Sequence, residues 1–277
     1  MTLVPLEFPE SWRLTIIEPV ADTGLAKVWK AKMPDGTLVA LKLYHKTDRG
    51  NEAPGARLLA RWQNYGAVRI IAEQGKAVLM KWLDGPSLGD IARGGSPGKA
   101  SELLAEVARS LHAKPQVEPT SLMDLSAVFA SLFNCGFSQD CPETLKRDMV
   151  RAISIARFLL DTQSGSVPLH GDLHHDNVIQ TSDGLRVIDA KGYYGDPAFE
   201  LANALRHPKG LPHLVRQPEQ LNRCVALYSA AMDVQAKRLV QWAAAKCALS
   251  IVWRSNGEIV QDPEANLLNQ FLRAADQ

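Results

Sequence analysis

The sequence predicts an α+β fold of two lobes, with a β-rich N-terminal lobe over residues 1–84 and a mostly helical C-terminal lobe over residues 85–277. Two observations support this fold class. Short runs rich in β-branched and aromatic residues, separated by turn signals, fill the first lobe. After "LDGPSL" the apolar residues recur at helical spacing instead. A chain of 277 residues is also long enough to bury a core in each lobe.

The N-terminal lobe is expected to contain three strands, one helix and two further strands, in that order. "WRLTIIEPV", "AKVWKAKM" and "TLVALKLY" have strand character, and "PDG" marks a tight turn between the second and third. In the third strand Val39 and Leu41 share one face, and Ala40 and Lys42 share the other. "PGARLLARW" predicts a helix, since proline is tolerated in a first turn. "AVRIIAE" and "AVLMKWL" flank "QGK" and predict a hairpin.

The C-terminal lobe is expected to be helical apart from one small hairpin. "GKASELLAEVARSLHA" and "TLKRDMVRAISIARFLL" carry apolar residues at helical spacing. The short apolar runs "NVIQ" and "LRVIDA" surround "TSDG" and predict the hairpin. From Pro197 onward we expect helices to the end of the chain.

Composition argues against several classes of partner. With a net charge of +1, the chain lacks the strong positive charge that is typical of proteins that bind nucleic acid or an anionic membrane. The apolar stretch "LVQWAAAKCALSIVW" is interrupted by Gln241 and Lys246, so it predicts a buried helix rather than a membrane span. The N-terminus lacks a signal-peptide pattern, and the four cysteines form no C-x-x-C pair. We therefore expect a cytoplasmic protein with no nucleic-acid or membrane partner, and its oligomeric state stays open.

The segment "LHGDLHHDNVI", Leu169–Ile179, admits two interpretations. Zinc or a two-metal centre would use neutral histidines and carboxylates, and this segment offers several. Such sites usually recruit further ligands from distant loops, however, and the other histidines of the chain form no second cluster. The metal interpretation is therefore the weaker one. Its candidate ligands are His170, Asp172, His174, His175 and Asp176.

The stronger interpretation is a phosphoryl-transfer loop. In the kinase loop H-R-D-x-x-x-x-N, four residues separate the catalytic aspartate from a metal-binding asparagine. Asp172 and Asn177 have this spacing, with Gly171 in the place of the arginine. A second metal-binding aspartate should follow the next hairpin, and Asp189 ends "LRVID". A lysine is required on the third strand of the first lobe, where "VALK" places Lys42.

These motifs resemble a known family. "HGDLHHDN" is similar to the catalytic loop of aminoglycoside phosphotransferases. "IDAKGYYGDPAFELANALRHP", "FPESW", "ADTGLAKVWKAKMPDG", "GAVRII" and "LSIVW" resemble the streptomycin 6-phosphotransferase branch, the aminoglycoside/hydroxyurea antibiotic resistance kinases. The matches extend from Phe8 to about Trp253. The branch usually has proline where this chain has Ala190, and the nucleotide loop "ADTGLAKV" contains the single glycine Gly24.

The resemblance implies a protein-kinase-like two-lobed fold and a reaction. The N-terminal lobe would bind the nucleotide, and the C-terminal lobe would carry the catalytic and acceptor sites. The reaction would be Mg²⁺-dependent transfer of the γ-phosphate of ATP or GTP to a hydroxyl of an aminoglycoside, with streptomycin favoured. The alternatives are another small hydroxylated metabolite, hydroxyurea, or a catalytically silent nucleotide-binding protein.

The resemblance also implies roles for single residues. Asp172 would orient and deprotonate the acceptor hydroxyl, and Asn177 and Asp189 would hold Mg²⁺. Lys42 would contact the α- and β-phosphates, with Glu52 as its partner and Asp48 as the alternative. The linker between the lobes, with Met80, Lys81 and Leu83, would face the purine. His170 and Asp196 would support the site structurally. Lys191 would lie near the phosphates, in a structural or an electrostatic role.

A polycationic acceptor should meet carboxylates in the C-terminal lobe. Residues 192–277 contain eight acidic and nine basic side chains, so no acidic excess is visible in one dimension. Folding can still gather carboxylates on one rim. The candidates are Glu200, Asp233, Glu258, Asp262 and Glu264.

Overall fold

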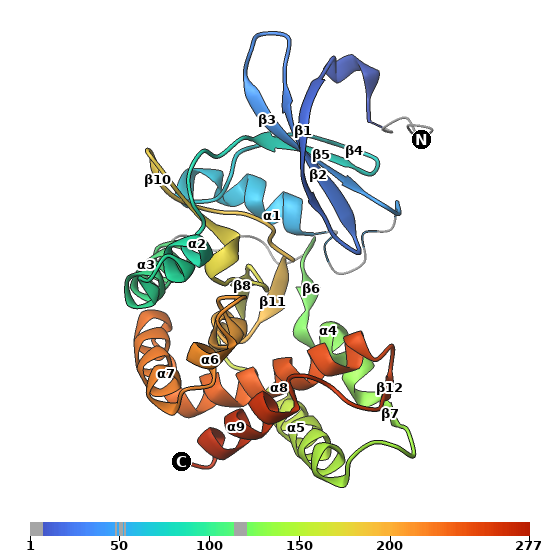
Figure 1. Cartoon of the computed structure of the whole chain (residues 1–277), viewed down its shortest axis with the longest axis vertical. Helices are drawn as coiled ribbons and strands as arrows, with labels where there is room; N and C mark the ends of the chain where they lie inside the picture. Colours follow the sequence, from blue (N-terminus) through green and yellow to red (C-terminus); the bar gives the residue numbers. More distant parts are fainter. Residues whose placement is uncertain (1–7, 48, 50–51, 53, 114–120) are drawn as a thin grey trace.

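The computed structural model describes residues 8–47, 49, 52, 54–113 and 121–277, and Figure 1 shows a sheet-containing lobe above a helical one. The predicted two-lobed α+β fold is confirmed. The chain passes from the first lobe to the second between strand β5 (Ala77–Lys81) and helix α2 (Leu88–Arg93). No helix in the described ranges combines the length and apolar character that crossing a bilayer requires.

The N-terminal lobe contains an antiparallel sheet with helix α1 against it (Figure 1). The strand order in space is β1-β2-β3-β5-β4, so β3 is the central strand. The predicted order of three strands, a helix and two strands is confirmed. Besides β5, the elements are β1 (Thr15–Asp22), β2 (Ala26–Lys32), β3 (Leu38–Tyr44), α1 (Gly55–Trp62) and β4 (Ile70–Gln74).

The two faces of β3 have different surroundings, as its alternation predicts. Val39 and Leu41 belong to a small apolar cluster on one side of the sheet. Ala40 lies on the other face, opposite Met80 in β5, within the main core that includes α1. Lys42 shares that second face and lies opposite Val78. The central strand therefore directs Lys42 toward the region between the lobes.

Helix α8 (Ala236–Arg254) is the core of the C-terminal lobe. Thirteen of its residues are buried, and α4, α5, α7 and α9 pack around it. Two helices were not expected from the sequence, the short α2 and α4. The other helices are α3 (Pro97–His112), α4 (Leu125–Phe133), α5 (Glu143–Asp161), α6 (Pro212–Val215), α7 (Pro218–Met232) and α9 (Ala265–Ala275).

Short strands interrupt the helices. The expected hairpin is β9 (Val178–Thr181) with β10 (Gly184–Val187). The expectation of helices from Pro197 to the end is wrong at one place, where β12 (Glu258–Ile259) pairs in parallel with β7 (Gly136–Phe137). Strand β11 (Tyr193–Gly195) lies between β8 (Val167–Leu169) and β6 (Met123–Asp124). The segment "HGDLHHDN" connects β8 to β9, so strands fix both of its ends.

Candidate active site

A cavity of about 340 Å³ brings together five residues of the predicted phosphoryl-transfer site, Lys42, Glu52, Asp172, Asn177 and Asp189. The turn between β1 and β2, with Gly24, forms one wall. The segment between β8 and β9 and the residues after β10 form the other. The polar residues that line the cavity are Thr23, Lys42, Glu52, Asp172, His174, Asp176, Asn177, Asp189, Lys191 and Lys209.

Lys42 lies at the centre of a buried network of charges. Its Nζ is 3.0 Å from Oε2 of Glu52 and 3.2 Å from Oδ1 of Asp189. Burial alone would lower the pKa of Lys42, but the two carboxylates outweigh it and raise the pKa well above its usual value. Glu52 also pairs with Lys191, and its pKa is lowered because these ammonium groups outweigh its burial. Asp48, the alternative partner of Lys42, lies outside the described residues.

Close packing of α1 brings Glu52 to this site. A Cβ atom on Gly55, the first residue of α1, would lie 1.7 Å from the carbonyl oxygen of Ala190. Only glycine allows this approach. The start of α1 therefore lies directly on the segment that carries Asp189 and Lys191, and Glu52, three residues before it, reaches both Lys42 and Lys191.

Gly171 allows the turn that presents Asp172. Its φ is +81°, a conformation that favours glycine, and a Cβ there would lie 2.6 Å from the ring of Tyr193. An arginine at this position, as in the protein-kinase loop, would meet both obstacles. The packing of Tyr193 in β11 therefore explains why this loop contains glycine.

Asp172 is held by a residue that the sequence analysis missed. Nδ2 of Asn203 donates to Oδ1 of Asp172 at 2.8 Å, and Asn203 itself accepts from Arg206. Asn203 is buried in a 3-10 helix thirty-one positions away. Burial would raise the pKa of Asp172, but the charges of His174, Lys191 and Lys246 lower it by more, so its pKa lies well below the usual range. The Asp172 carboxylate is therefore ionised at neutral pH.

Glu200 supports the loop and is not available to an acceptor, which corrects its assignment as a substrate-binding residue. It is 1% exposed, and its carboxylate accepts the backbone N–H groups of His170 (3.0 Å) and Gly171 (3.3 Å). Its Oε1 also lies 3.1 Å from Nε2 of His112. A carboxylate with these buried partners fixes the backbone just before Asp172.

His170 and Asp196 both occupy structural positions. The buried ring of His170 has Nε2 2.8 Å from the carbonyl oxygen of Ile188, the residue before Asp189. Asp196 accepts from the indole of Trp242 at 2.8 Å and pairs with Arg238, both on α8. Asp196 therefore anchors α8, and the direct support of the loop comes from Glu200 instead.

Asn177 and Asp189 offer the oxygen ligands that Mg²⁺ prefers. Nδ2 of Asn177 donates to the carbonyl oxygen of Asp172 at 2.9 Å, which leaves its Oδ1 for a ligand. Asp189 uses Oδ1 toward Lys42, and its side chain is 43% exposed in the cavity. Its φ of +58° turns the chain sharply at this point. The two side chains fit a magnesium site on one wall of the cavity.

The zinc interpretation finds little support in the geometry. His174, Asp176 and His207 bring ligand atoms within 4.8 Å of one another. The two imidazole rings are stacked, however, with centroids 3.8 Å apart and planes 7° apart. Since ring nitrogens bind metals in the ring plane, stacked rings cannot both point at one ion. Nδ1 of His174 also already accepts the N–H of Asp176 at 3.2 Å.

The backbone N–H of Leu83, in the linker after β5, is free among the described residues. The N–H of Lys81 donates to Arg69 at 2.9 Å, and that of Trp82 donates to Leu38 at 3.2 Å. Within the described residues no acceptor takes the N–H of Leu83. Met80 is buried, with its side chain near Lys42 and Asp189. Leu83 can therefore offer a hydrogen bond to a purine edge.

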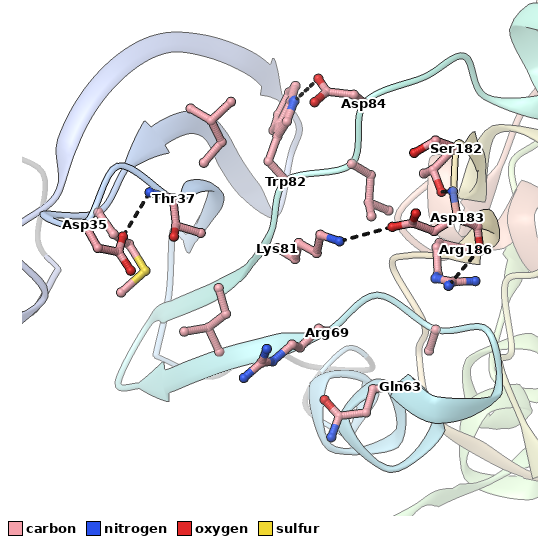
Figure 2. A pocket seen from close by; sticks show the side chains of 16 residues that line it. Asp35, Thr37, Gln63, Arg69, Lys81, Trp82, Asp84, Ser182, Asp183 and Arg186 are labelled. Carbon is pink, nitrogen blue, oxygen red and sulfur yellow. Dashed lines mark hydrogen bonds and ion pairs between the residues drawn. The ribbon is translucent and has the colours of Figure 1, made fainter.

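Figure 2 shows a second cavity, of about 720 Å³, beside this linker. The side chain of Lys81 extends across it toward Asp183 at the tip of the β9–β10 hairpin, at 3.5 Å. Both side chains are more than half exposed, so this ion pair contributes little to stability. None of Lys42, Asp172 and Asp189 lines this cavity, which is therefore separate from the site around Asp172.

Most of the predicted acidic rim is not open to an acceptor. Asp262 and Glu264 bind Arg254, and Glu264 also binds Arg206 at 2.5 Å. The pKa of Glu264 is lowered because the two guanidinium groups outweigh its burial. Asp233, at the end of α7, and Glu258, in β12, are exposed at the surface. Neither lines the cavity around Asp172.

A buried lysine in α8 lies close enough to Asp172 for its charge to help lower the pKa of that carboxylate. Lys246 in α8 is 5% exposed, its Nζ donates to Ser250 at 3.2 Å, and it lies over the ring of Trp253. No carboxylate pairs with it in the part of the chain that the structure describes. Burial, the largest cause, lowers the pKa of Lys246 to about 7.

Comparison with known proteins agrees with this geometry. The family model described as aminoglycoside/hydroxyurea antibiotic resistance kinase matches residues 11–257. A streptomycin 3''-kinase from Klebsiella pneumoniae is 33% identical over 251 residues, which cover 88% of this chain and 90% of that protein. A hydroxyurea phosphotransferase from Kitasatospora aureofaciens is 29% identical over 208 residues, or 72% of this chain and 59% of that protein.

Solved structures share the fold at low sequence identity. An aminoglycoside phosphotransferase in complex with ADP and hygromycin B has a TM-score of 0.65 and 10% identity, over 96% of this chain and 95% of that one. An ethanolamine kinase from Plasmodium vivax has a TM-score of 0.62 and 16% identity, over 95% of this chain and 82% of that one. The fold is that of protein-kinase-like small-molecule kinases, and the chain belongs to the aminoglycoside/hydroxyurea antibiotic resistance kinase family.

Proposed function

We propose that this protein transfers the γ-phosphoryl group of ATP or GTP, with Mg²⁺, to a hydroxyl of an aminoglycoside, and that streptomycin is the favoured acceptor. One observation carries the phosphotransferase assignment: Lys42, Asp172, Asn177 and Asp189 line the same cavity of about 340 Å³. Phosphoryl transfer needs a cation for the phosphates, metal ligands and a carboxylate for the nucleophile, all within reach of one phosphorus atom.

The nucleotide would lie between the lobes. The Leu83 N–H would bind the purine edge, and the Lys42 ammonium group, held by Glu52, would bind the α- and β-phosphates. Asn177 and Asp189 would hold Mg²⁺, which would neutralise charge on the phosphate oxygens. Met80 and Lys81 would contribute through their position in the linker rather than through charged side chains. A nucleoside triphosphate donor also favours the cytoplasm as the location of the reaction.

Asp172 would act mainly by orienting the acceptor. Its lowered pKa makes it a weak base, so it would hold the hydroxyl by a hydrogen bond and accept the proton only as the new bond to phosphorus forms. Asn203 occupies Oδ1 of Asp172, which leaves Oδ2 for the acceptor. The charge of Asp172 and its fixed orientation both favour a hydroxyl group as nucleophile.

The acceptor assignment is supported by relatives rather than by an acidic pocket. One relative, at 33% identity, is named a streptomycin 3''-kinase, whereas the sequence motifs resemble the 6-phosphotransferase branch. These names place the phosphate on different hydroxyls of the same antibiotic. We therefore propose streptomycin as the acceptor. Analysis of the product would identify which of its hydroxyl groups is phosphorylated.

Mass spectrometry of the purified protein with Mg²⁺, streptomycin and either ATP or GTP tests this proposal. We expect a singly phosphorylated product, and NMR of that product identifies the hydroxyl. Hydroxyurea belongs in the same assay, because a hydroxyurea phosphotransferase is 29% identical to this chain. Turnover of hydroxyurea or another alcohol but not of streptomycin would leave a kinase with a different acceptor. Nucleotide binding without turnover of any acceptor would support the silent nucleotide-binding protein.

A further inference from the structure

The segment His207–Lys209 is docked on the catalytic loop by three contacts. The ring of His207 stacks on that of His174, and its Nδ1 is 3.5 Å from Oδ2 of Asp176. The backbone N–H of Lys209 is 3.4 Å from the same Oδ2. Nη1 of Arg93, in α2, donates to the carbonyl oxygen of Lys209 at 3.0 Å. The backbone of Lys209 is therefore fixed beside Asp176, four residues after Asp172.

Lys209 belongs to the cavity around Asp172. It lines the cavity together with Asp172 and His174, and Gly24 and Leu25 of the nucleotide loop line it too. Its ammonium group is close enough to His174 for its charge to contribute to the lowered pKa of that ring, in which burial is the largest cause. A positive charge is thus placed at the catalytic-loop end of the cavity.

Lys209 differs from the other two lysines of this cavity in its partners. Lys42 pairs with Glu52 and Asp189, and Lys191 pairs with Glu52. Among the described residues, no carboxylate pairs with the ammonium group of Lys209, which is exposed. In the described part of the chain no ion pair fixes the Lys209 side chain, so its ammonium group is available to an incoming anion.

We propose that Lys209 is a catalytic residue whose ammonium group contacts the non-bridging oxygens of the γ-phosphoryl group during transfer. This inference rests on the proposed phosphotransferase function. The acceptor hydroxyl is held at Asp172, so the γ-phosphorus must lie next to the catalytic loop, where the Lys209 backbone is fixed. Lys42 would hold the phosphates that stay with the nucleotide, and Lys209 would hold the one that leaves.

The transfer step defines what Lys209 would do. The acceptor oxygen forms a bond to the γ-phosphorus, and the bond from that phosphorus to the β,γ-bridging oxygen breaks. The bridging oxygen leaves with the nucleoside diphosphate, and the acceptor proton passes to Asp172 and then to solvent. Lys209 neither gives nor takes a proton. It would stabilise the charge on the equatorial γ-oxygens, which is a large part of catalysis in such reactions.

Binding measurements separate this role from a general effect on the site. We would compare the parent with Lys209→Ala, Lys209→Arg and Lys237→Ala, an exposed lysine in α8 outside the cavity. Calorimetry with Mg²⁺ and either a non-hydrolysable triphosphate analogue or the diphosphate is the first measurement. In Lys209→Ala, triphosphate affinity should fall roughly two- to fivefold, as for one exposed charged contact, while diphosphate affinity stays unchanged. Lys209→Arg should recover most of the loss, and Lys237→Ala should match the parent.

Kinetics give the second measurement. In Lys209→Ala, kcat/KM should fall about tenfold or more, because one donor to the transferring group is lost. Equal losses of triphosphate and diphosphate affinity, or an unchanged kcat/KM in Lys209→Ala, would overturn the proposal. The binding comparison needs no acceptor. If Lys209→Ala weakens triphosphate binding as expected but the parent phosphorylates no aminoglycoside, the acceptor assignment is refuted and this inference stands.

Discussion

Asn203 donates a hydrogen bond of 2.8 Å to the Asp172 carboxylate across a sequence separation of thirty-one residues. The amide is itself fixed, because Arg206 donates to its Oδ1 at 2.8 Å and also binds Ser250 and Glu264. A series of hydrogen bonds thus connects the Asp172 carboxylate, through Asn203 and Arg206, to Ser250 near the end of α8. Orientation of Asp172 therefore depends on the packing of the C-terminal helices and not only on its own loop.

Replacing Asn203 with alanine should slow turnover more than it weakens nucleotide binding. Without the amide, the carboxylate can rotate, and misplaced catalytic groups lose rate steeply. We expect kcat to fall by about 10- to 100-fold, with nucleotide affinity within about twofold of the parent. Asn134→Ala, on the exposed end of α4, is the matched control. If the two variants had equal kcat values, Asn203 would not orient Asp172.

Asp172→Asn should abolish turnover while nucleotide still binds. The amide keeps the shape but cannot accept the acceptor proton, and general-base and positioning effects are worth about 10²–10⁴-fold. Because the pKa of Asp172 is lowered, its carboxylate stays ionised as pH falls from 8 toward 5. The parent should therefore show no loss of kcat/KM from this group over that range. A near-normal rate in Asp172→Asn would remove its assigned role.

The sequence could predict the parts of the site that lie in local motifs. Lys42 follows from the third strand, and Asp172, Asn177 and Asp189 follow from the spacing of one loop and one hairpin; the structure brings all four to one cavity. The roles of Asn203 and Glu200 could not be predicted, because Asn203 lies in a short 3-10 helix and Glu200 directly after another, and tertiary packing determines where both are placed. The acidic rim was misjudged for a related reason: counting charges does not reveal that Arg206 and Arg254 already bind Asp262 and Glu264.

Asp189→Ala should remove Mg²⁺-dependent nucleotide binding, and Asn177→Ala should weaken it. Both residues line the same cavity and offer the oxygen atoms that Mg²⁺ prefers. Titration of nucleotide with and without Mg²⁺ measures the effect, with Asp183→Ala at the tip of the β9–β10 hairpin as the control. Asp189→Ala also leaves Lys42 with one carboxylate partner instead of two. Variants with the metal dependence of the parent, or activity supported by zinc instead of magnesium, would favour the zinc interpretation of the Leu169–Ile179 segment.

Lys246→Met should stabilise the protein more at neutral pH than at alkaline pH. The pKa of Lys246 is about 7 in the folded chain, below its ordinary value of 10.5, because burial disfavours the charged form. Between these two values the unfolded chain binds more protons, so the free energy of unfolding of the parent rises with pH. Methionine removes this dependence. Chemical denaturation at pH 7 and pH 9 should show the stability gap between variant and parent narrowing by about 1–3 kcal/mol. A gap that is constant with pH would mean that Lys246 keeps its charge in the folded chain.

Gly171→Ala should damage both stability and catalysis, and Gly165→Ala separates the two causes of damage. Both glycines have positive φ, +81° at Gly171 and +64° at Gly165, so alanine strains the backbone at either position by about 1–3 kcal/mol. A Cβ at Gly165 meets nothing within 4 Å, whereas at Gly171 it would lie 2.6 Å from the ring of Tyr193. Relief of that contact requires the loop to move, and Asp172 is the next residue. Gly165→Ala should therefore lower the free energy of unfolding but keep kcat, while Gly171→Ala should lower both.

The double variant Gly171→Ala/Tyr193→Ala tests whether the contact with the Tyr193 ring causes the loss of kcat. If the double variant regains part of the kcat that Gly171→Ala lost, that contact is the cause. Gly171→Ala with normal kcat would show that the loop can present Asp172 without the glycine turn.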